Sequence, residues 1–228
     1  MNPTLNQVKK HEYGKIAGNK SINTKIYACF KYLCKKDVLQ FVKKFGEQPH
    51  GQEQVMHTFR ELILGAFLAS NGLVVRYDYR VGRKTPDWCI FDDKSSLLGI
   101  TELINFNIDK RAEIAQNRQI EAGRMWWGYV KPNNPRLYQR IGEKADLYCA
   151  LVTKYNVPYV VSVFSDFRAV AKIDEVRQCL FEDHGGLFNL CPRLSGVLFF
   201  EELSGQYCFE YIRNPHSVIG IDLPSGVF

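Results

Sequence analysis

Apolar and polar residues recur along the chain with two different periods, and the order of these periods predicts a mixed α/β fold. Residues 55–70 are strongly apolar, as in a buried helix, and Asn71-Gly72 supplies a left-handed stop at its end. Three predicted strands joined by two turns come next. The strands lie at residues 73–80, 87–91 and 97–106, and the turns at 81–84 and 92–96. A helix followed by a three-stranded meander therefore opens the predicted core.

The rest of the predicted core alternates helices with strands. Residues 158–164 are almost continuously apolar, as in a strand that is buried on both faces. The whole pattern indicates a mixed central sheet flanked by helices. Besides that strand, helices are predicted at residues 108–131, 134–155 and 172–182, and strands at 196–200 and 206–212.

The first 50 residues have a different character from the rest of the chain. Residues 25–46 have the spacing of one helix, whereas the residues before them lack a clear period. Pro49 and Gly51 then break the pattern. We therefore predict a basic N-terminal arm over residues 1–50 and one α/β domain over residues 51–228.

The positive charge of the chain is concentrated in this arm. The whole chain has a net charge of +6, and its first 50 residues hold ten lysines against three acids. Lysines neutralise phosphates and release their counterions, so a basic arm on a near-neutral domain suggests a polyanion as partner. A solvated lysine-rich surface is an equal alternative. The lysines that we expect to contact nucleic acid are Lys35, Lys36, Lys43 and Lys44.

Several classes of protein are disfavoured by composition. The seven cysteines are scattered and form no C-x-x-C pair, so neither a zinc site nor a disulfide framework is indicated. No apolar run reaches the roughly 18 residues of a membrane span. The N-terminus also lacks the apolar core of a signal peptide. We expect a cytoplasmic protein with reduced thiols and no membrane partner.

Three acids occur where the predicted elements could bring them together. Glu61 lies on the apolar helix, Asp87 opens the second strand, and Glu102 is in the middle of the third. Carboxylates so placed could bind Mg²⁺ or Mn²⁺, and such an ion activates water and stabilises charge on a phosphodiester. The alternatives are a simple turn exit at Asp87 and a partner for Arg60 at Glu61. His57, one turn before Glu61, is expected to be a surface histidine.

The segment Gly82–Trp88, GRKTPDW, followed by Ile100–Ile104, ITELI, resembles the PD-(D/E)XK nuclease superfamily. The motif of that superfamily is an acid after proline and then Glu-x-Lys on the next strand. The resemblance covers about residues 53–216, and the order of the elements carries more weight than the short motifs. It implies a restriction-endonuclease-like core.

The resemblance also implies a function. It indicates a Mg²⁺-dependent nuclease that hydrolyses phosphodiester bonds, with DNA as partner and a homodimer as an open alternative. Asp87, Glu102 and Glu61 would then be metal ligands and catalytic residues. Arg83 and Lys84, in the turn before Asp87, would contact phosphates, although they are equally expected as ordinary turn charges.

The motif lysine is missing, because Ile104 occupies its position. In the superfamily that lysine positions or activates the attacking water, so cleavage depends on a substitute. Lys144 lies on the apolar stripe of the predicted helix 134–155, four residues before Tyr148. This Lys-x-x-x-Tyr spacing is similar to the Gln-x-x-x-Tyr motif of one branch of the superfamily, so Lys144 is our candidate catalytic lysine.

Three alternatives stay open at this point. The Lys144 stem could lie on the core with its amine in solvent. The acids could form a structural ion pair with Lys144 and bind no metal. The domain could also be a non-catalytic nucleic-acid-binding or assembly module, an interpretation that Ile104 favours.

Overall fold

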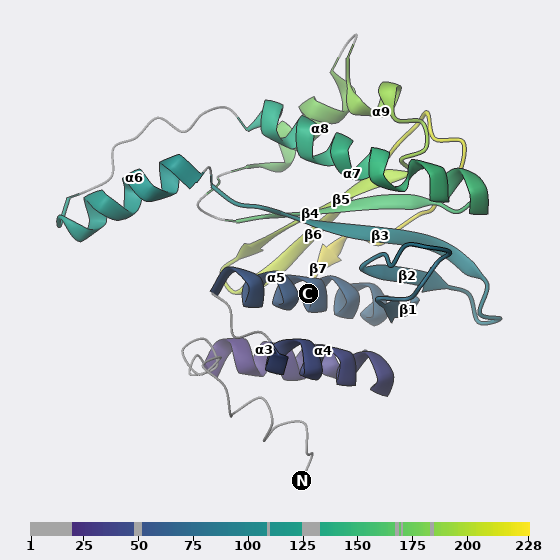
Figure 1. Ribbon diagram of the computed structural model, residues 1–228, viewed down its shortest axis with the longest axis horizontal. Coiled ribbons are helices and arrows are strands. Elements are labelled where there is room, and N and C mark those ends of the chain that lie inside the picture. The colour runs from purple at the N-terminus through teal and green to yellow at the C-terminus, as the bar shows by residue number, and fades with distance from the viewer. Residues whose placement is uncertain are drawn as a thin grey trace. The chain divides into compact units, whose positions relative to one another are not determined.

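Seven strands and seven helices make up the described part of the chain in the computed structural model, which confirms the predicted α/β class (Figure 1). The strand order follows the chain from β1 to β7, and the pairing is mixed. The chain divides into two units, residues 1–101 and 102–228, and strand β3 runs from one unit into the other. The structure describes residues 20–47, 52–108, 110–124, 133–166, 169, 171–182 and 185–228.

Three helices form the helical part of the first unit: α3 (Lys20–Phe30), α4 (Lys35–Glu47) and α5 (Gln52–Ser70). Both α3 and α4 pack against α5, and α4 also contacts β1. Phe41 of α4 is fully buried, and its ring stacks on that of Tyr77 at 4.0 Å between centroids. Helix α4 therefore contributes apolar side chains to the core of this unit.

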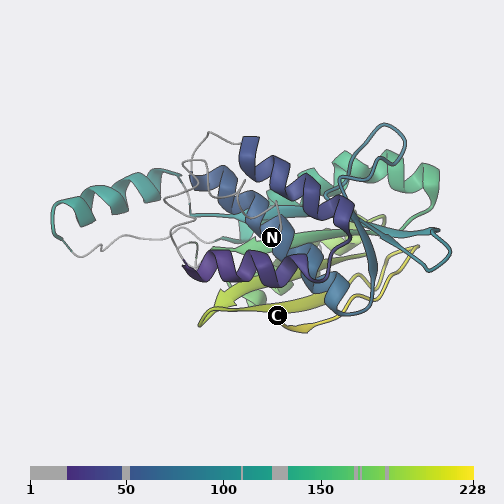
Figure 2. The ribbon, with the colours of Figure 1, turned by 90° about the horizontal axis from the view of Figure 1, so that it is seen from below.

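The single helix predicted over residues 25–46 is wrong, since the chain breaks at residues 31–34 between α3 and α4. Figure 2 shows the chain reversing direction there. The apolar period continues through the break, so local sequence does not reveal it. A straight helix of that length would extend about 33 Å, whereas the reversal lets both halves bury apolar residues on α5. The arm boundary expected near residue 50 lies outside the described residues.

Helix α5 and the meander follow the predicted order. Gly72, with φ +86°, provides the left-handed stop after α5. Strands β1 (Val74–Tyr77), β2 (Trp88–Phe91) and β3 (Leu97–Phe106) pair antiparallel. Strand β1 is shorter than predicted because Asp78 takes a left-handed conformation, with φ 47°. A bridge between Val81 and Lys84 then closes the predicted turn.

The second unit holds the remaining elements, and most match the prediction. Helix α7 packs against β4 and α8, and Figure 1 shows both helices on the same side of β4 and β5. All seven residues of β4 are buried, as expected for a strand covered on both faces. Strand β4 pairs parallel with β5, and β5, β6 and β7 pair antiparallel. The elements are α6 (Lys110–Glu121), α7 (Asn134–Tyr155), β4 (Tyr159–Ser165), α8 (Ile173–Phe181), α9 (Leu187–Leu190), β5 (Gly196–Leu203), β6 (Gln206–Arg213) and β7 (Gly226–Val227).

Two short elements, α9 and β7, were not predicted, and α6 covers the first part of residues 108–131, where the helical pattern precedes the aromatic run at residues 126–129. The last part of that range, residues 125–131, lies outside the described residues. Among the helices that the structure describes, none combines the length and apolarity needed to cross a membrane.

Candidate functional site

Lys144 reaches the carboxylate of Glu102 within the second unit. Its ammonium nitrogen donates to Glu102 Oε2 at 2.6 Å, and the Tyr148 hydroxyl donates to Glu102 Oε1. Lys144 and Tyr148 lie one turn apart on α7, so the Lys-x-x-x-Tyr spacing directs both side chains to one acid. Each carboxylate oxygen of Glu102 thus has its own donor.

The acid of this ion pair is buried, whereas its lysine is partly exposed. The side chain of Glu102 is only 5% exposed, whereas that of Lys144 is 31% exposed. Tyr148 packs against Tyr159 with ring centroids 5.2 Å apart, and the Tyr159 hydroxyl donates to the backbone oxygen of Lys144 at 3.1 Å. These contacts hold the Lys144 turn of α7 against β4. Ile104, in the motif-lysine position, is a buried apolar residue.

Glu61 is the centre of a second cluster, in the first unit. Its carboxylate is 2% exposed and contacts Lys44 Nζ at 2.8 Å and His57 Nε2 at 3.0 Å. The Tyr77 hydroxyl donates to the same oxygen as Lys44, and Lys44 also contacts Tyr77. Lys44, expected to bind nucleic acid, therefore has an internal partner as well. The two buried glutamates share one pattern, because each carboxylate binds one lysine and one tyrosine.

The charges around Glu61 shift two pKa values in opposite directions. Burial by itself raises the pKa of Glu61, but the hydrogen bond from His57 and the charge of Lys44 outweigh it, and the pKa lies below its ordinary value. Burial, with the nearby charge of Glu61, strongly raises the pKa of the Tyr77 hydroxyl. Glu61 is thus an anion and Tyr77 a neutral donor at physiological pH.

Trp88 fixes the backbone beneath this cluster. Its indole nitrogen donates to the backbone oxygen of Glu61 at 2.8 Å, and its side chain is fully buried. The ring crosses α5 at Gly65, where an added Cβ would lie 1.9 Å from the nearest ring atom. Only glycine leaves room for the indole at this position.

Asp87 precedes Trp88 at the start of β2. Its backbone oxygen accepts from the amide of Asp78 at 3.1 Å, and its charge contributes to the raised pKa of Tyr77. Trp88 pairs with Thr101 across the meander, and Glu102 is the residue after Thr101. The Asp87 side chain is half-buried.

Carboxylate oxygens such as those of Glu102 are ligands of the kind that hard divalent cations prefer. The two oxygens of Glu102 accept from Lys144 and Tyr148. Mg²⁺ is often held by one or two carboxylates together with waters. No group of three His, Cys, Asp or Glu side chains that could hold a metal ion occurs in the described ranges.

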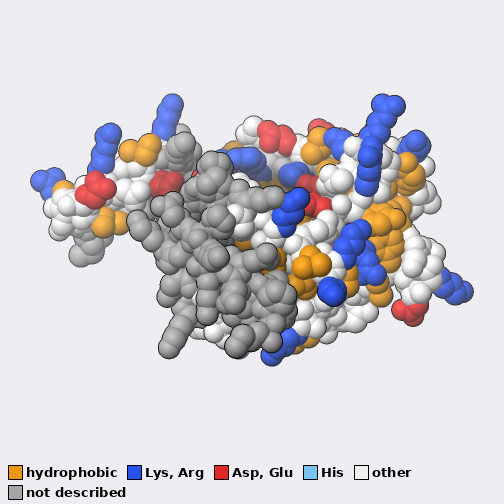
Figure 3. Space-filling model, turned by 60° about the horizontal axis from the view of Figure 1, so that its bottom comes forward, with side chains coloured by type: hydrophobic (Ala, Val, Ile, Leu, Met, Phe, Trp, Pro, Cys, Tyr) orange, Lys and Arg blue, Asp and Glu red, His pale blue; other side chains and the backbone are white. Residues whose placement is uncertain are grey.

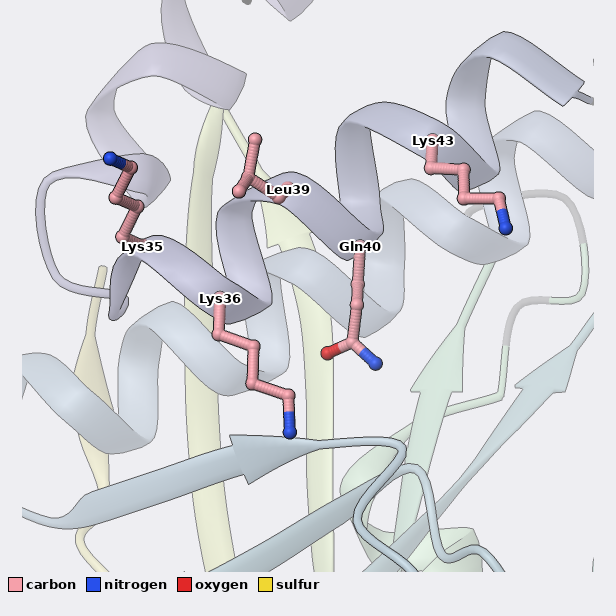
Figure 4. A pocket seen from close by; sticks show the side chains of 5 residues that line it. All are labelled: Lys35, Lys36, Leu39, Gln40 and Lys43. Carbon is pink, nitrogen blue, oxygen red and sulfur yellow. The ribbon is translucent and has the colours of Figure 1, made fainter.

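Most of the predicted nucleic-acid contacts lie at the surface of the first unit. Lys35, Lys36 and Lys43 line a shallow hollow on α4 (Figure 4). Arg83, in the turn after β1, is exposed, and Lys84 is half-buried. Figure 3 shows many lysine and arginine side chains standing out from the described surface.

Comparisons with known proteins identify no relative. No family model, no curated protein and no solved structure matches the chain.

Tyr77 belongs to the Glu61 cluster but was not predicted. It is 16 residues from Glu61 in the chain, so no local pattern links them. His57 was expected at the surface, with contact to the site through its one-turn spacing as the alternative; it is 31% exposed and contacts Glu61.

Proposed function

We propose that the protein is a Mg²⁺- or Mn²⁺-dependent nuclease of PD-(D/E)XK type that hydrolyses phosphodiester bonds in DNA. The observation that supports it is the 2.6 Å contact between Lys144 and Glu102. It places a lysine on the acid of the third strand, where the motif lysine is replaced by Ile104. A restriction-endonuclease-like core and a basic arm over residues 1–50 belong to the same proposal.

In this proposal Asp87 and Glu102 would hold the metal ion, which would supply activation of a water and charge stabilisation at the phosphate. Lys144 has three donor hydrogens and uses one on Glu102, so two remain for a water or a phosphate oxygen. Tyr148 holds the other oxygen of Glu102 and keeps the carboxylate from rotating. Lys144 thus acts as a positioning and charge-stabilising group.

Glu61 organises its own cluster, because its oxygens accept from Lys44, Tyr77 and His57. Glu102 likewise accepts from Lys144 and Tyr148, so these contacts do not separate the two acids as metal ligands. In this proposal Glu61 would add a ligand or orient a water.

A cleavage assay tests the proposal. Plasmid and linear DNA are incubated with Mg²⁺ or Mn²⁺ and with the wild type, Asp87→Asn or Lys144→Met. The exposed Lys154→Met, on the same helix, is the matched control. We expect both site variants to lose activity by about 100-fold or more, and the control to keep it. Equal cleavage by wild type and Asp87→Asn would overturn the mechanism.

A second candidate function is a non-catalytic nucleic-acid-binding domain. It is favoured by the engagement of both buried glutamates with lysines, since such ion pairs need no metal. Under this hypothesis the wild type binds DNA but shows no metal-dependent cleavage. Calorimetric titration with Mn²⁺ separates the two, because only the nuclease hypothesis expects a heat of binding that Asp87→Asn removes.

A further inference from the structure

The outer face of α4 and the end of β1 form one basic surface in the first unit. Figure 4 shows a hollow on α4 lined by Lys35, Lys36, Leu39, Gln40 and Lys43. A second hollow is lined by Lys36 and Asp37 of α4 together with residues 76–80. Lys36 lines both hollows, so they lie next to each other. We call this the α4–β1 surface.

Its charge fits a polyanion. The two hollows together hold five basic side chains and two acids, and the hollow on α4 has no acid. Asp37 is buried, and burial raises its pKa, whereas Asp78 is exposed in the second hollow. The basic side chains are Lys35, Lys36, Lys43, Arg76 and Arg80. Phosphates spaced along a strand could contact several of them at once.

An aromatic ring distinguishes this surface from a simple lysine patch. Tyr79 is 44% exposed and lines the second hollow. Its ring rests edge-on against Phe91, with centroids 5.0 Å apart. The ring is therefore held in place while part of it faces solvent. A base can stack on such a ring, and stacking requires an unpaired base.

We propose that the α4–β1 surface binds single-stranded nucleic acid, with Tyr79 as the stacking platform and the five basic residues on the phosphates. This rests on the proposed function and deepens it, because it names an unpaired strand as the part of the substrate that the protein holds. Arg76, Tyr79 and Arg80 extend the set of contacts expected from the sequence.

Equilibrium binding in the presence of EDTA tests this without interference from cleavage. A labelled single strand of about 16 nucleotides, the matching duplex and heparin are titrated with the full chain, and fluorescence anisotropy is measured. We expect Tyr79→Leu to weaken single-strand binding by about tenfold and to leave heparin binding unchanged. We expect Lys36→Glu with Lys43→Glu to weaken all three, and to flatten the salt dependence of single-strand binding by about 1.4 in log–log slope.

Lys94→Glu is the matched control, since Lys94 is exposed in the turn after β2 and lines neither hollow. Unchanged single-strand binding by Tyr79→Leu, or an equal loss with Lys94→Glu, overturns the proposal. Tighter binding to anionic lipid vesicles than to the single strand also overturns it. Cleavage is measured separately on the same variants, so loss of this site with intact cleavage is distinguishable from failure of the nuclease proposal.

Discussion

Replacing Lys144 by Met tests whether its contact with Glu102 holds α7 to β3. Methionine keeps most of the length of the side chain but removes the ammonium that lies 2.6 Å from Glu102 Oε2. The carboxylate is 5% exposed, so water cannot easily take the place of the lost donor. The variant is left with a buried charge that retains Tyr148 as a donor.

The structure sets the expected magnitude. Removing one partner of a fully buried ion pair costs about 3–5 kcal/mol. Lys144 is 31% exposed, and Tyr148 still donates to the other oxygen, so we expect a smaller loss of about 2 kcal/mol in the free energy of unfolding. For a chain of this size that corresponds to a fall of about 4–8 °C in Tm.

Urea denaturation of four proteins measures the pair itself: wild type, Lys144→Met, Glu102→Gln and the double variant. We expect the double variant to lose clearly less than the sum of the two single losses, with a coupling energy of about 1–2 kcal/mol. Tyrosine fluorescence and far-ultraviolet circular dichroism should give the same transition. If the losses are simply additive, the ammonium points to solvent and Lys144 does not support Glu102.

Two further predictions concern the first unit. Gly65→Ala should lower the free energy of unfolding by about 1–3 kcal/mol, because the new Cβ would overlap the Trp88 ring. Gly46→Ala is the control and should have no such cost, because nothing lies within contact distance of its added Cβ. Equal stabilities of the two variants in urea would contradict the packing of Trp88 on Gly65. The lowered pKa of Glu61 means that its contribution to stability is complete above its unfolded pKa and is lost as pH falls through the folded pKa. The advantage of wild type over Glu61→Gln in urea should therefore shrink below about pH 4, and an advantage independent of pH would refute the ionic role of Glu61.

The sequence predicted best those features that depend on regular spacing. Helix α7 was placed by the stripe that includes Lys144, and the same stripe put Lys144 on the inward face, where it meets Glu102. Strand β4 was placed by its continuous apolar run, since few other elements have one. Spacing within one helix or strand can be read from the sequence alone, without knowing which other elements pack against it.

Features set by distant partners could not be predicted. The break between α3 and α4 is set by packing on α5, and the apolar period passes through it unchanged. Lys44 was assigned to nucleic acid from charge alone, and nothing in its neighbourhood shows that a glutamate 17 residues later is buried beside it. The charge of α4 indicated that this helix is basic, but only the structure shows which of its lysines lie at the surface and which contact the buried Glu61.

The packing of α4 decides where the chain can be shortened for laboratory work. A fragment that starts after residue 50 would lose Phe41 from the Tyr77 ring and would leave Glu61 without Lys44. Such a fragment would expose apolar surface and is expected to aggregate during expression. Expression vectors for this protein should therefore keep α3 and α4 together with the rest of the chain.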